Sequence, residues 1–127
     1  MTPQVPSVLA EMAQLLVRNS APDVAPGERA NALTLAAAVL GVAAEVWDAA
    51  AENLVQENRA LAALLDDAAG EASLRLSALR AENARLRSLL IAAHAAAEEA
   101  GDTAREEAIW AELIASTERR KLSISPS

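Results

Sequence analysis

The sequence contains no cysteine, phenylalanine or tyrosine, and its aromatic residues are Trp47 and Trp110. The absence of cysteine excludes disulfides and thiolate metal sites. Two tryptophans are too few for a surface on which a run of nucleobases stacks. The apolar residues, 53% of the 127, are mainly Ala, Leu, Val and Ile. Because Ala and Leu are among the strongest helix formers, the composition predicts an all-α protein.

Basic residues are scarce too, with 11 Lys and Arg against 18 Asp and Glu and a net charge of −7. Nucleic acid is therefore not an expected partner, since phosphates require a basic surface. The longest apolar stretch, residues 32–44, is shorter than the roughly 20 residues of a membrane span. No positively charged segment precedes an apolar one at the start, so no signal peptide is predicted. We expect a cytoplasmic protein without a membrane partner.

Helix boundaries follow from the few prolines and glycines. Pro22 and Pro26 interrupt the first helical pattern, and Gly70 and Gly101 mark the later breaks. We predict one helical domain over residues 1–127, a bundle of about four helices. The predicted helices cover residues 7–18, 28–69, 71–100 and 103–121, and a disordered tail is expected at 122–127.

A short pattern, Glu-Asn-x-x-Leu-x-x-Leu-Leu, occurs at residues 57–65 and again at 82–90. Heptad assignment places two apolar residues per heptad around each copy, with Asn58 or Asn83 at an a position. A single Asn in such a position fixes register or partner choice at a cost in stability. Replacing both by Leu is therefore expected to raise the melting temperature. We call the predicted helix contact the seam; it comprises Leu54, Asn58, Leu61, Leu65, Leu76, Leu79, Asn83 and Leu86.

The two copies can be joined in two ways. A turn at Gly70 gives a long antiparallel, coiled-coil-like hairpin, whereas one continuous helix needs a stutter between the copies. In one register of the hairpin Glu57 faces Arg80, and in the next it lies beside Arg87. In both registers an acidic side chain lies opposite a basic one. We therefore predict the hairpin and leave its register open.

Groups suited to catalysis are few. His94 is the single histidine, and with Glu98 one turn later it supplies two possible ligands. A metal site needs three or four ligands, so no metal, cofactor or catalytic residue is predicted and an enzyme is not expected. Trp47, His94 and Trp110 could line a ligand pocket, although large apolar side chains at helical spacing more often belong to a core.

Residues 30–46 are apolar on almost every side of the predicted helix. A helix that is apolar all round is buried all round, so it needs more neighbours than one short helix supplies. We therefore predict a non-enzymatic helical interaction or assembly module, forming a homodimer or binding another protein. The alternative is a bundle that binds a small acyl or other apolar ligand.

Two stretches, ENARLRSLLIAAHAAAE at 82–98 and AIWAELIASTERR at 108–120, resemble a family of short, uncharacterised all-helical bacterial proteins of unknown function. The resemblance extends over about residues 28–121. Genes of that family can lie near acyl-CoA dehydrogenase and phosphotransferase-like genes. The resemblance therefore implies an accessory role, and it assigns neither an activity nor catalytic residues.

Overall fold

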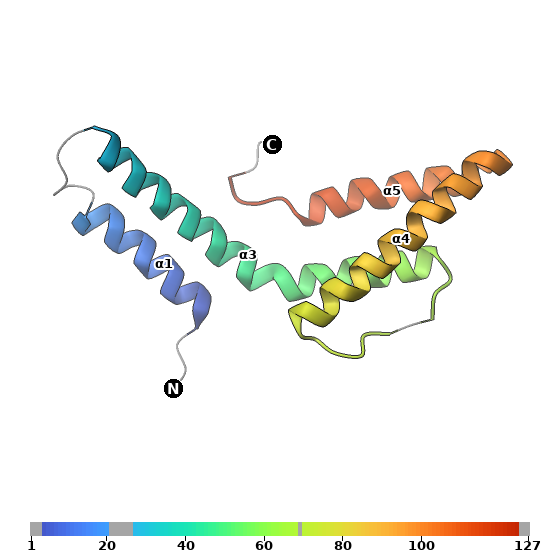
Figure 1. Cartoon of the computed structure of the whole chain (residues 1–127), viewed down its shortest axis with the longest axis horizontal. Coiled ribbons are helices and arrows are strands. Elements are labelled where there is room, and N and C mark those ends of the chain that lie inside the picture. Colours follow the sequence, from blue (N-terminus) through green and yellow to red (C-terminus); the bar gives the residue numbers. More distant parts are fainter. Residues whose placement is uncertain (1–3, 21–26, 69, 125–127) are drawn as a thin grey trace. The chain divides into compact units, whose positions relative to one another are not determined.

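The computed structural model describes residues 4–20, 27–68 and 70–124, and over these residues it contains four α-helices and no strand (Figure 1). The predicted all-α helical bundle is thus confirmed. The elements are α1 (Val5–Leu15), the π-helical turn η1 (Leu16–Ser20), α3 (Glu28–Leu64), α4 (Leu76–Ala100) and α5 (Thr103–Arg119).

The chain divides into two compact units, Met1–Ala49 and Ala50–Ser127, which we describe one at a time. The division falls within α3. The first unit contains α1, η1 and the beginning of α3, and the second contains the end of α3 with α4 and α5. The single domain predicted for residues 1–127 includes both units.

The main difference in helix boundaries lies between α3 and α4. The helix predicted for 28–69 ends at Leu64, and the next begins only at Leu76. Asp66 has a φ of 55°, the left-handed conformation that Asp tolerates better than most residues. The left-handed Asp66 therefore follows the end of α3 and ends the helical path well before Gly70. Of the tail predicted to be disordered, 125–127 lie outside the described residues.

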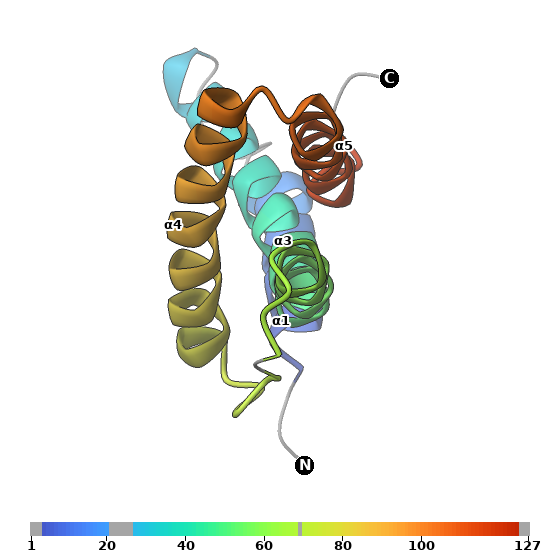
Figure 2. The same ribbon diagram turned by 90° about the vertical axis from the view of Figure 1, so that its right-hand side faces the viewer.

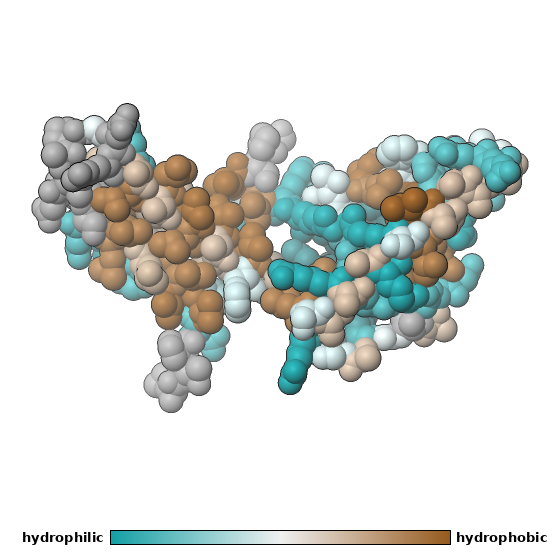
Figure 3. Space-filling view, in the orientation of Figure 1, coloured by the Kyte–Doolittle hydropathy of each residue, from teal (hydrophilic) through white to brown (hydrophobic). Residues whose placement is uncertain are grey.

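The first unit sets α1 beside the first half of α3 (Figure 1). Among its described residues the buried hydrophobic side chains are two alanines, Ala37 and Ala44. Figure 3 shows a brown, hydrophobic area over α1 and the first half of α3. The large apolar side chains of the same unit stay exposed. They are Val5, Val8, Met12, Leu15, Val17, Leu35, Val39, Val46 and Trp47.

The second unit has a core of its own, to which all three helices contribute. Its buried members are Leu61, Ala62, Leu86, Leu90 and Ile109. Leu64, Leu65 and Leu113 pack against them. Burial of several branched side chains in one cluster makes this unit the better packed of the two.

The tight antiparallel hairpin of the second unit is formed by α4 and α5 (Figures 1 and 2). Gly101 ends α4 with a φ of 66°, a conformation that glycine adopts without steric cost. Asp102 then caps α5, its carboxylate accepting a hydrogen bond from the Arg105 backbone N–H at 3.1 Å. The boundary predicted at Gly101 is therefore correct.

The predicted antiparallel pairing of the two seam segments is wrong in its direction. In Figures 1 and 2, α4 crosses the end of α3 obliquely and runs in the same general sense. Asn58 contacts Leu79 and Asn83, while Leu61, further along α3, packs with Leu86, further along α4. The reason is the connection at 65–75, which is long enough to return across the end of α3 before α4 begins.

Candidate functional site

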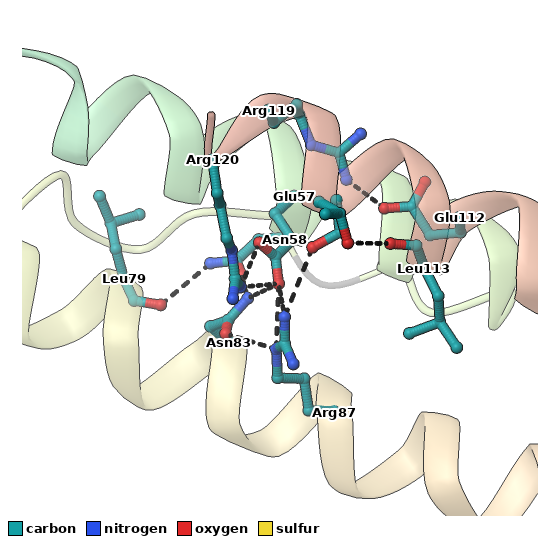
Figure 4. A network of polar contacts seen from close by, with 11 residues as sticks. Glu57, Asn58, Leu79, Asn83, Arg87, Glu112, Leu113, Arg119 and Arg120 are labelled. Carbon is teal, nitrogen blue, oxygen red and sulfur yellow. Dashed lines mark hydrogen bonds and ion pairs between the residues drawn. The ribbon is translucent and has the colours of Figure 1, made fainter. Parts of the chain in front are cut away.

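A buried polar cluster lies where α4 and α5 meet the end of α3 (Figure 4). At its centre is the carboxylate of Glu57, which is 3% exposed. Asn58, Asn83 and Ser116 are buried beside it, and Arg87 and Arg120 reach it from α4 and from the end of α5. The cluster therefore joins all three helices of the second unit.

The Glu57 carboxylate accepts hydrogen bonds from three side chains. Oε1 lies 3.0 Å from Nδ2 of Asn83 and 2.6 Å from Nη2 of Arg87. Nη2 of Arg120 lies 2.8 Å from Oε1 and 2.7 Å from Oε2. Two arginines thus share one buried carboxylate, and charge-assisted bonds of this kind are about twice as strong as neutral ones.

This environment sets the protonation state of Glu57. Burial by itself would raise its pKa, but hydrogen bonds from Asn83, Arg120 and Arg87 outweigh burial and lower the pKa to about 2. The carboxylate is therefore ionised at neutral pH and already occupied by donors. A general base needs a pKa near the operating pH and an accessible proton acceptor, so the cluster fits an anchor between helices better than a catalytic centre.

The two asparagines of the repeated pattern are in direct contact. Asn83 donates to Oδ1 of Asn58 at 2.9 Å, and Asn58 in turn donates to the Leu79 carbonyl at 3.0 Å. Asn83 also accepts a hydrogen bond from Nε of Arg87 at 3.1 Å. The pattern therefore does have a structural role, because the asparagines of its two copies meet in the cluster.

Every residue predicted for the seam is at least partly buried. Asn58, Leu61, Leu79, Asn83 and Leu86 are buried, and the remaining three, Leu54, Leu65 and Leu76, are partly buried. The pairing of Glu57 with Arg87 is the one given by the second of the two registers considered, and Arg80 is exposed. Individual contacts were thus predictable although the direction of α4 was not.

The contribution of α5 to the cluster was not predicted from the sequence. Arg120 was not expected to bind Glu57, and Ser116 was not expected to approach Arg87, whose Nη2 lies 3.5 Å from the hydroxyl. A usable signal was present, since Ile109, Leu113 and Ser116 recur at three-to-four spacing and mark the buried face of α5.

The structure reverses the expected effect of replacing both asparagines by leucine. The double variant removes one donor from Glu57 and one acceptor from Arg87, so the cluster loses two hydrogen bonds to charged groups while both arginines still bind Glu57. We expect the second unit to lose about 2 kcal/mol of stability, because a hydrogen bond to a charged group contributes about 1.5–3 kcal/mol. Urea unfolding followed by Trp110 fluorescence in a Trp47→Phe background measures this loss. The control Asn53→Leu should change it little, and a stabilised double variant would contradict the cluster.

The predicted pocket residues are only partly brought together. His94 on α4 and Trp110 on α5 contact each other edge to face, with ring centroids 5.9 Å apart. Nε2 of His94 lies 3.8 Å from Glu98 and makes no hydrogen bond within the described part of the chain. Trp47 belongs to the first unit and is exposed there. The three-residue pocket therefore stays a prediction.

The described ranges also contain other acidic side chains and two further hollows. Among those residues no group of three or more His, Asp or Glu side chains could hold a metal ion. Two hollows flank the connection between α3 and α4, but charged side chains along them pair with each other. Arg59 binds Glu71 at 2.7 Å, and Arg85 binds Glu82 at 2.6 Å and Asp67 at 2.8 Å.

Comparisons with known proteins do not test the resemblance seen in the sequence. The resemblance noted in residues 82–98 and 108–120 therefore remains an expectation. No protein-family model, no curated protein and no solved structure matches the chain.

Proposed function

We propose that this protein is a non-enzymatic helical assembly module, in which the first unit binds a second copy of the chain. The observation that carries the proposal is the apolar surface of the first unit. Leu35 and Val39, one turn apart on α3, are 66% and 58% exposed. Large apolar side chains on α1 are exposed as well, Met12 and Leu15 among them. Contiguous surfaces of this kind mark interaction sites.

Two helices cannot cover this surface by themselves. The unit is an α1–α3 pair whose buried hydrophobic side chains, in the described residues, are alanines. Full burial of one Val, Leu or Met side chain contributes about 1.5–3 kcal/mol. Two copies placed face to face would form a four-helix arrangement with an apolar interior, the commonest way for paired helices to bury such faces.

A second copy fits this surface better than a charged partner does. No charged residue occurs between Ala30 and Ala44, so the face offers no charge pattern that would select a foreign protein. In a two-fold contact the same apolar patch lies on both copies. Each patch then meets an equally apolar surface, and no second set of residues is needed. The second unit has its own core and does not depend on the contact.

The same composition leaves a second way to cover the surface. Within α3 the segment Ala30–Leu64 includes an 18-residue window with mean hydropathy 1.5, of which 11% is buried. By length and composition this helix could cross a membrane. We favour association in solution because α1 is short, and Asn31, Thr34 and Glu45 place polar groups along the apolar segment.

Sedimentation of the full chain between about 1 and 100 μM tests the proposal. We expect a species of twice the 13.2 kDa chain mass at micromolar concentration and dissociation on dilution. A parallel flotation assay with phosphatidylcholine–phosphatidylglycerol vesicles should leave the protein in the aqueous fraction. A monomer over the whole range, or protein that floats with the vesicles, would overturn the proposal.

A further inference from the structure

The first unit contains a groove between α1–η1 and α3 with a volume of about 400 Å³. Most of its wall is apolar and formed by Ala13, Val17, Ala37 and Ala38. The groove exists because alanines occupy the positions where the two helices face each other, and their side chains are too short to fill the space between them. Small-molecule sites typically have such a volume and a largely apolar lining.

Among the described residues that line this groove, Arg18 is the one with a charged side chain. Arg18 lies in η1, and its guanidinium donates a hydrogen bond to the side-chain oxygen of Gln14, one turn earlier. None of the described residues that line the groove is acidic, and the Gln14 side chain to which Arg18 donates is uncharged. This differs from the hollows of the second unit, where Arg59 and Arg85 are neutralised by carboxylates.

The remaining polar groups of the groove are arranged to leave Arg18 as the main donor. The Thr34 hydroxyl donates to the Ala30 carbonyl at 3.0 Å, so its proton is used within α3. The Gln14 amide nitrogen can donate beside the guanidinium. Arg18 also lies in a π-helical turn, and such turns are often found at functional sites.

From this arrangement we propose that the groove binds an aliphatic monocarboxylate. The carboxylate pairs with Arg18, which presents two parallel donors to it. The hydrocarbon chain lies along Ala13, Val17, Ala37 and Ala38, where it replaces water on apolar surface. This ligand site goes beyond the proposed self-association, since Leu35 and Val39 do not line the groove.

Decanoate, used below its micellisation concentration, is the probe, and calorimetric titration of the full chain is the measurement. We expect one saturable site per chain and at least tenfold tighter binding of decanoate than of decanol, which lacks the charge. Arg18→Gln should abolish this preference and leave decanol binding unchanged. The control Arg80→Gln removes the same charge from an exposed position of α4 and should retain the preference.

A second variant tests the apolar wall. Ala38 is exposed to the groove, so Ala38→Phe places a ring in the ligand space without displacing a buried side chain, and both ligands should lose affinity at least tenfold. Circular dichroism verifies that the variant keeps its helices. If Ala38→Phe loses them, the comparison of Arg18→Gln with the parent alone tests the proposal. Absence of decanoate binding at 1 mM, or equal decanoate affinity in Arg18→Gln and the parent, would overturn the proposal.

Discussion

Replacing Glu57 by alanine is expected to lower the free energy of unfolding of the second unit by about 3 kcal/mol. The change removes the carboxylate to which Asn83, Arg87 and Arg120 donate. Loss of one partner from a buried ion pair costs about 3–5 kcal/mol, because the remaining charges lose their compensation. We expect the lower end of this range, since both arginine side chains are partly exposed and can regain water.

The same cluster predicts how stability depends on pH. In the folded protein the pKa of Glu57 is about 2, below the ordinary value of 4.5. The stability that the ionised Glu57 contributes to the folded protein is therefore fully present above about pH 4.5 and is lost as the pH falls toward 2. A difference of one pKa unit corresponds to about 1.4 kcal/mol, so roughly 3 kcal/mol of stability should disappear across this window. Glu57→Gln should remove most of that dependence.

Unfolding in urea at pH 7 and at pH 3, followed by Trp110 fluorescence in a Trp47→Phe background, measures both effects in the second unit. Glu71→Ala is the matched control, because Glu71 also pairs with an arginine, but Arg59 is largely exposed. Exposed ion pairs contribute about 0–1 kcal/mol. If Glu57→Ala costs no more than Glu71→Ala, the cluster does not hold the three helices together.

Introducing lysine at both Leu35 and Val39 is expected to weaken self-association at least a hundredfold. Each copy of the chain loses two large apolar side chains from the proposed contact, and each side chain is worth about 1.5–3 kcal/mol when fully buried. The two-fold symmetry of the contact also brings the new positive charges of both copies onto one face, where they repel. A hundredfold change corresponds to about 2.8 kcal/mol, so the estimate is conservative.

Sedimentation over the same concentration range compares this variant with a control that carries the same new charge. Ile91 and Ile114 of the second unit are 72% and 63% exposed, and Ile91→Lys with Ile114→Lys should leave association unchanged. If both double variants dissociate equally, net charge rather than the first unit governs association. If only the control dissociates, the contact belongs to the second unit.

Local features of this protein could be predicted from the sequence because they depend on near neighbours in the chain. Ala and Leu favour helix wherever they dominate, and Gly101 ends α4 because it can take a positive φ. The spacing of Leu61, Leu79 and Leu86 marked side chains that are indeed buried. The repeated Glu-Asn likewise drew attention to Asn58 and Asn83, which contact each other.

Only the tertiary structure decided how these elements meet. The direction of α4 depends on the path of residues 65–75 and on the left-handed Asp66, and apolar periodicity carries no information about either. Arg120 reaches Glu57 across 63 positions of sequence because α5 folds back along α4. The sequence by itself determined that there would be helices and which faces would be apolar. Packing of three helices around one carboxylate determined their arrangement, because a buried charge is tolerated only where enough donors converge on it.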